Sequence, residues 1–299
     1  MPLAGPARGH LAMLLFSALV AGSFSLGALS ANLIDPAALN AVRFWIAAAI
    51  IGALALARGG IPRSALAAPW RYLVLGGLFA SYFVLMFEGL KTAAPVSTAA
   101  VFTLTPLMSA GFGWLTMRQR LTGRMALALA IGGAGALWVI FRADLAALLR
   151  FEIGRGETLY FIGCIAHAAY TPLVRKLNRG ESPVVFTFGM LIAGGVLLSL
   201  WAAPALAATD WAGLPPIVWV TLAYISVFAS AASFLALQYA TLRLPSAKVM
   251  AYTYLTPSWV IAWELALGQG APGWVILAGV AATVLALLIL LKDEAAARG

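Results

Sequence analysis

Charged side chains are scarce in this sequence. Asp, Glu, Lys and Arg make up 10% of its 299 residues, against about 25% in a typical soluble domain. Because 63% of the residues are also hydrophobic, an ordinary soluble fold is excluded. Cysteine is nearly absent as well: Cys164 stands alone, which rules out an internal disulfide and a cysteine-rich metal site. We therefore expect neither a metal ion nor any other cofactor.

Long hydrophobic segments fill most of the chain. We predict ten membrane-spanning helices of roughly 20 residues each, the length that crosses a bilayer. The predicted spans are residues 11–31, 36–57, 70–90, 95–116, 124–141, 157–177, 183–204, 216–240, 245–267 and 273–292. The predicted fold class is an all-α polytopic membrane protein in contact with the lipid bilayer. The first segment could instead be a signal peptide cleaved near Ala28-Leu29-Ser30, but the repeat described below needs it as a helix.

The basic residues alternate between the two sides of the predicted bundle. With both termini in the cytoplasm, the outer loops hold only Lys91, Arg142, Arg150 and Arg155 of the 19 Lys and Arg, and Arg43 lies within the second span. The others fall in cytoplasmic segments, as the positive-inside rule requires. The net charge of +9 is thus explained by topology, and we expect no nucleic-acid partner.

The triplet Leu-Thr-Pro occurs twice in helix-length apolar segments, at 104–106 and at 255–257. Proline inside a helix costs about 3 kcal/mol. Its occurrence twice within the same triplet therefore suggests a shared structural role. The triplets lie in the fourth and ninth spans, which divides the chain into two five-helix repeats, residues 1–150 and 151–299. Five spans is an odd number, so the repeats are inverted, as in many secondary transporters. We predict that Pro106 and Pro257 are paired hinges; a packing role alone is the alternative.

Polar and aromatic residues gather at mid-depth in most spans, whereas the fifth and tenth have almost none and are predicted to lie at the periphery. This pattern predicts a partly polar central cavity near the midplane. The alternative for any single hydroxyl is a bond to its own helix or a neighbouring one, and for His167 a bond to a nearby hydroxyl. The predicted substrate-binding residues are Ser81, Tyr82, Thr98, Phe102, His167, Tyr170, Tyr224, Tyr252, Thr256 and Trp259.

Few ionisable residues lie within the spans, and such residues are often functional. We predict that Arg43 and Glu264 form an outer gate, a salt bridge between the halves that breaks when the cavity opens. Glu88 belongs either to this gating set or to an interfacial i,i+3 ion pair with Lys91. Catalysis is not expected. Cys164 and His167 lack an orienting carboxylate, and a membrane enzyme acting on lipids needs a clustered site that is not visible here.

The segment LTPLMSAGFGWLTMRQRLT (104–122) and the Arg43-Phe44 pair resemble the ten-helix EamA type of the drug/metabolite transporter superfamily, over essentially the whole chain. Arg118-Gln119 and Gly268-Gln269 stand where that family usually has Gly-Glu. The resemblance, strongest to its bacterial aromatic amino acid exporters, implies alternating-access export of aromatic and other apolar amino acids. It implies a bacterial inner-membrane location and a monomer or weak homodimer. Export of other metabolites or drugs is the alternative.

Overall fold

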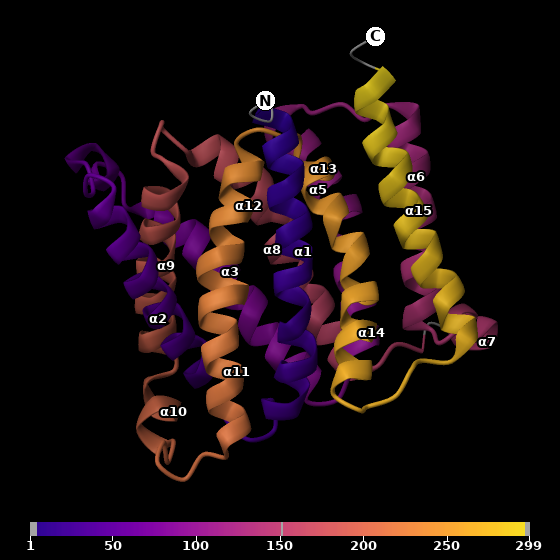
Figure 1. Cartoon of the computed structure of the whole chain (residues 1–299), viewed down its shortest axis with the longest axis horizontal. Helices are drawn as coiled ribbons and strands as arrows, with labels where there is room; N and C mark the ends of the chain where they lie inside the picture. The colour runs from indigo at the N-terminus through magenta and orange to yellow at the C-terminus, as the bar shows by residue number, and fades with distance from the viewer. Residues whose placement is uncertain (1–4, 151, 297–299) are drawn as a thin grey trace.

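The computed structural model describes residues 5–150 and 152–296, and every regular element within them is helical. The long helices run roughly side by side in one bundle (Figure 1). In chain order the elements are α1 (Gly5–Ser30), α2 (Pro36–Ala57), the 3₁₀ turn η1 (Arg63–Leu66), α3 (Trp70–Leu90), α4 (Pro95–Phe102), α5 (Thr105–Met117), α6 (Gly123–Ile140), α7 (Leu145–Leu149), α8 (Arg155–Leu177), α9 (Pro183–Trp201), α10 (Ala203–Ala208), α11 (Pro216–Ser226), the π-helical η2 (Val227–Ala232), α12 (Ser233–Thr241), α13 (Ser246–Ala251), the 3₁₀ turn η3 (Tyr252–Leu255), α14 (Thr256–Ala266) and α15 (Trp274–Ala296).

Two helices begin and end at the predicted residues, and their sequence explains why. α2 starts at Pro36, where proline costs little because the first-turn N–H has no helical partner. The Asp35 side chain accepts hydrogen bonds from the N–H groups of Ala37 and Ala38 at 2.8 and 2.9 Å, which satisfies two donors of the first turn. α3 spans 70–90, as its apolar run predicts.

Eight helices in the described part of the chain are long and apolar enough to cross a membrane, with α4–α5 counted as one and α11–η2–α12 as another. The two remaining predicted spans coincide with α8 and with α13–η3–α14. α8 carries Glu157 in its first turn and Arg175 and Lys176 in its last. The α13–η3–α14 segment is divided by its 3₁₀ turn. The total of ten spans stays a prediction.

The two halves of the sequence interlock. α8 packs against α3 and α5, and in the same way α1 packs against α11, α12 and α14. α2 lies against α9, and α6 lies against α15 at one edge of the bundle (Figure 1). The beginning of α1 and the end of α15 lie at the same end of the bundle (Figure 1). Each half is thus completed by elements of the other.

The edge pair, α6 and α15, meets at two glycines. A Cβ atom added to Gly135 would lie 2.6 Å from the carbonyl oxygen of Gly279, and one added to Gly279 would lie 2.7 Å from that of Gly135. No side chain fits in so short a distance, so glycine is required at both positions. The least polar helices of the two halves therefore pack closely on each other.

Both Leu-Thr-Pro triplets mark breaks between helical segments. Pro106 lies in the first turn of α5 and Pro257 in the first turn of α14, where proline is well tolerated. The chain thus avoids most of the cost of a proline inside a helix by starting a new segment. The breaks meet: the hydroxyl oxygens of Thr105 and Thr253 are 3.3 Å apart. On one side of this contact α5 packs on α13, and on the other α4 packs on α14.

Candidate functional site

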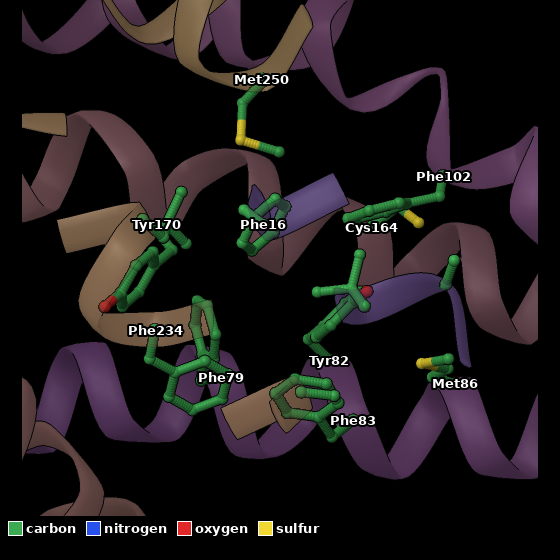
Figure 2. Packing of buried hydrophobic residues seen from close by; sticks show 14 of the residues in the cluster. Phe16, Phe79, Tyr82, Phe83, Met86, Phe102, Cys164, Tyr170, Phe234 and Met250 are labelled. Atoms are coloured by element: carbon green, nitrogen blue, oxygen red, sulfur yellow. The ribbon is translucent and has the colours of Figure 1, made fainter. Parts of the chain in front are cut away.

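A cluster of aromatic rings fills the centre of the bundle. Phe79, Tyr82 and Phe83 occupy one face of α3, because residues three and four apart lie together on a helix. The centre of the Phe79 ring lies 3.9 Å from the ring centre of Tyr170 on α8 and 4.7 Å from that of Phe234 on α12. These side chains point toward one another from elements of both halves (Figure 2). The cluster therefore joins the two halves of the chain at the centre of the bundle.

His167 is the polar member of this cluster. Its ring is 4.5 Å from Tyr82 and 5.1 Å from both Phe79 and Phe102, measured between ring centres. It is buried, and its Nδ1 has no hydrogen-bond partner in the described part of the chain. The bond to a neighbouring hydroxyl that was the alternative is therefore not made by this atom.

A small cavity lies against His167. It is lined by Phe16, Val20, Ser23, Phe24, Phe79, Tyr82, Phe83, Met86, His167 and Phe234, and its volume is about 10 Å³. Ligand pockets typically hold about 300–1,000 Å³, so the centre of the bundle is closed in this structure. The Ser23 Oγ, like His167 Nδ1, is buried and lacks a partner among the described residues. Two polar atoms thus remain available beside an otherwise apolar space.

Hydrogen bonds hold several rings of the cluster in place. The hydroxyl groups of Tyr82 and Tyr160 are 2.8 Å apart. The Gln238 side-chain amide donates to the Tyr170 hydroxyl at 2.8 Å. The aromatic cluster is thus oriented by polar contacts that connect α3 with α8 and α8 with α12.

Four of the ten predicted substrate-binding residues meet in this cluster: Tyr82, Phe102, His167 and Tyr170. Thr98 is buried but donates to the Ala94 carbonyl of its own helix at 2.9 Å, the ordinary alternative for a threonine in a helix.

Thr256 is buried at the second break, and its hydroxyl has no partner among the described residues. It therefore offers a free polar group, although it does not line the central cavity.

Four other predicted binding residues lie elsewhere. Ser81 is exposed, because it occupies a different face of α3 from Tyr82. The Trp259 side chain is 39% exposed and its indole N–H donates to Ser17 at 3.3 Å. The Tyr224 hydroxyl donates to the Leu19 carbonyl, and that of Tyr252 lies 2.9 Å from His10 Nδ1 near the start of α1. The prediction that these four line the central cavity was wrong for this structure.

The predicted salt bridge between Arg43 and Glu264 is not formed. Arg43 is fully buried, and its guanidinium donates to the Ser230 hydroxyl, the Asn40 side-chain oxygen and the Ala229 carbonyl. Glu264 is only half-buried on α14. The gate prediction failed because Arg43 points inward to η2 and its contacts are taken by neutral oxygens.

Glu88 makes the alternative contact. Its carboxylate lies 3.0 Å from Lys91 Nζ, and both side chains are about one-third exposed, at 35% and 31%. This is an i,i+3 ion pair at the end of α3.

Sequence reasoning missed most of the cavity lining, including Phe79, Phe83 and Phe234. The signal for the first two was present, since Leu75, Phe79, Tyr82, Phe83 and Met86 form an apolar stripe with helical spacing on α3. Phe234 had no comparable signal, because it approaches from the other half of the chain.

No three His, Cys, Asp or Glu side chains come together as a metal site within residues 5–150 and 152–296. The lining of the central cavity is mainly aromatic and aliphatic, with the hydroxyls of Ser23 and Tyr82 and the imidazole of His167. Such a lining can bind an apolar group and make a few directed hydrogen bonds.

Comparison with known proteins identifies the family. Residues 7–141 and residues 154–292 each match the EamA-like transporter family. The chain belongs to the EamA-like transporter family. It is therefore a multi-pass membrane transporter whose partners are the lipid bilayer and a small-molecule substrate.

A curated transporter and a solved structure are also similar to this chain. A Bacillus subtilis (strain 168) protein described as the uncharacterized transporter YyaM is 25% identical over 266 residues, covering 88% of this chain and 86% of its own. A protein of known crystal structure superposes with a TM-score of 0.72 at 23% identity, over 97% of this chain and 98% of that chain. This second likeness concerns the fold alone.

Proposed function

We propose that this EamA-like transporter exports aromatic and other apolar amino acids across a bacterial inner membrane. The observation that carries the proposal is the central cluster: aromatic rings from both halves enclose a closed cavity with two unpartnered polar atoms, Ser23 Oγ and His167 Nδ1. Aromatic walls suit apolar and aromatic side chains. The polar atoms suit the ammonium and carboxylate groups of an amino acid.

The proposed mechanism is alternating access by two inverted five-helix repeats, 1–150 and 151–299, with ten spans and both termini cytoplasmic. The family match to each half and the reciprocal packing of α1 and α8 support the repeat. The end of α15 lies at the same end of the bundle as the start of α1, which supports an even number of spans (Figure 1). Pro106 and Pro257 are proposed to act as hinges, since each begins a new helical segment at mid-span.

A flux experiment tests the function. The purified protein is reconstituted into liposomes that are loaded with labelled Phe, Tyr, Trp, Leu or Thr. Efflux of each amino acid is measured with and without a pH gradient. We expect efflux of the aromatic substrates and Leu. No flux of any amino acid rejects the amino acid proposal, and the comparison with and without the gradient shows whether efflux depends on it.

A matched pair of phenylalanine variants tests the location of the site. Phe79 is 1% exposed in the cluster, whereas Phe228 is 46% exposed on the outside of the bundle. Phe79→Ala should reduce aromatic efflux about tenfold, the upper end of the cost of one lost ring contact. Phe228→Ala should leave it within twofold. Equal sensitivity of the two variants rejects the central cluster as the binding site.

The topology is tested with single-cysteine variants. Cys164 is the only cysteine and is buried, so Cys164→Ser gives a cysteine-free background. Cysteines placed in the 58–69 and 142–150 loops should react with an impermeant thiol reagent from opposite sides. Labelling of both from one side rejects the proposed topology.

A further inference from the structure

Two arginines are fully buried among the described residues, Arg43 and Arg71, but only one has a carboxylate partner. Arg71 lies 2.6 Å from the Glu181 carboxylate. Arg43 makes no ion pair with any described residue, although it lies well inside α2. Ionisable groups inside a membrane protein are usually paired, because an uncompensated buried charge is costly. The missing anion at Arg43 needs an explanation.

The contacts of Arg43 leave part of its guanidinium unused. Nε donates to Ser230 Oγ at 2.6 Å, Nη1 to Asn40 Oδ1 at 3.2 Å, and Nη2 to the Ala229 carbonyl at 2.8 Å. A guanidinium has five N–H groups, so one N–H on each terminal nitrogen is left over. Two N–H groups on adjacent terminal nitrogens match the two oxygens of a carboxylate.

The site that holds Arg43 is itself unusual. Ser230 and Ala229 belong to η2, a π-helical stretch inside an otherwise α-helical span. π-Helical turns are rare and often occur at functional sites. Here the turn supplies both a hydroxyl and a carbonyl to a cation from the other half of the chain.

Arg43 is separated from the central cavity by one aromatic ring. Its guanidinium carbon lies 3.6 Å from the centre of the Phe83 ring, and Phe83 lines the cavity and stacks on Phe234 at 5.5 Å. Among the described residues, no Asp or Glu lines this cavity. Phe83 is thus the ring that lies between the Arg43 guanidinium and the cavity, and it would have to move for Arg43 to reach the space at the centre.

We propose that Arg43 binds the carboxylate of the transported molecule once Phe83 moves aside, and that the substrate class is monocarboxylates with an apolar body. This rests on the proposed role of the central cavity as the transport site, and it deepens that role by naming the group that selects the cargo. The substrate supplies the anion that the protein omits. The guanidinium binds the carboxylate of the substrate, and the aromatic cluster packs against its apolar body.

Three related compounds test the proposal by direct binding to the purified full-length protein in lipid nanodiscs. Phenylalanine has both charged groups, 3-phenylpropionate has only the carboxylate, and phenethylamine has only the ammonium. The wild type should bind both carboxylates about tenfold or more tightly than phenethylamine, the scale of a charge-assisted hydrogen bond. Arg43→Met should remove that advantage and leave phenethylamine within twofold, and Arg43→Lys should restore part of it.

The outcomes separate this proposal from the proposed function. Binding of 3-phenylpropionate but not phenylalanine rejects amino acid export and supports the carboxylate site. Preference for phenethylamine, no saturable binding of either carboxylate, or equal loss of all three ligands in Arg43→Met overturns the carboxylate site. If both Arg43 variants fail to fold, Phe83→Ala provides the test, because it should tighten binding of the carboxylates relative to phenethylamine. A ratio of carboxylate affinity to phenethylamine affinity that is unchanged from the wild type overturns the proposal.

Discussion

The two buried arginines show how differently one residue type is used at the end and at the centre of the bundle. Arg71, at the start of α3, donates to Glu181 and to the carbonyls of Leu177 and Ala68. The charge of Arg71 is neutralised within the fold, and its contacts connect α3 to the end of α8 and the loop that follows. Arg43 has only neutral oxygens and the Phe83 ring. A complete ion pair indicates a structural role, and an incomplete one indicates a place where a ligand completes the set.

The largest effect is expected from breaking the complete pair. Glu181→Gln leaves Arg71 buried without its carboxylate and should lower the free energy of unfolding by about 3 kcal/mol, the lower end for a buried pair because this one lies at the end of the bundle. Denaturant titration in mixed micelles measures the change. The control is Glu88→Gln, which removes the exposed pair with Lys91 and should cost under about 1 kcal/mol. Equal costs contradict the structural role of Arg71.

A smaller loss is expected from Arg43→Met. The variant loses three hydrogen bonds but also removes a buried charge that no carboxylate compensates, so we expect a cost under about 2 kcal/mol. Arg71→Met, which leaves Glu181 buried and unpaired, should cost more in the same titration. If Arg43→Met lowers the free energy of unfolding more than Arg71→Met does, the contrast between the two arginines is wrong, because Arg43 then has the structural role.

The complete pair should also give stability a pH dependence. Burial alone raises the pKa of Glu181, but hydrogen bonds from the Arg71 side chain and the Arg179 backbone N–H outweigh it and hold that pKa below its usual range. The stabilisation is then complete above the unfolded value of about 4.3 and is lost as the pH falls through the lower folded value. The stability gap between wild type and Glu181→Gln should therefore shrink as the pH falls below about 4. A gap that is constant with pH contradicts the ion pair.

The smallest effect concerns a neutral contact at the centre, the hydroxyl pair of Thr105 and Thr253. Thr105 also donates to the Phe102 carbonyl at 2.7 Å, so the bond to Thr253 at 3.3 Å is secondary. A double-mutant cycle with Thr105→Val and Thr253→Val should give a coupling of about 0.5 kcal/mol. A coupling above about 1.5 kcal/mol would mean that the halves are held together here by polar bonds rather than by aromatic packing.

Local sequence signals predicted the helices better than the site. Asp35-Pro36 and the apolar run 70–90 define α2 and α3 to the residue, because capping and hydrophobic length act within a few positions. The segment 157–177 was also predicted as a helix, yet its proline, Pro172, lies inside α8 without ending it. Packing of α8 against α3 and α5 offsets the cost of a proline inside the helix.

The site depends on contacts between distant residues, which the sequence does not reveal. Arg43 and Ser230 are 187 positions apart, and nothing in Val227–Ala232 distinguishes a π-helical turn from an α-helical one. Mid-depth alone selected both His167, which lies in the cluster, and Tyr224, which contacts α1 instead. Depth in the membrane follows from position in a span, whereas the direction of a side chain around the helix depends on which neighbours pack there.

The contact between the two Leu-Thr-Pro breaks has a mechanical consequence. α4–α5 and α13–η3–α14 touch near the middle of each, with α5 against α13 on one side and α4 against α14 on the other. Two rods that touch at their midpoints can rock on that contact, so that their arms part at one end and come together at the other. In the proposed alternating-access mechanism, this contact would act as a fulcrum that couples opening on one face of the membrane to closing on the other.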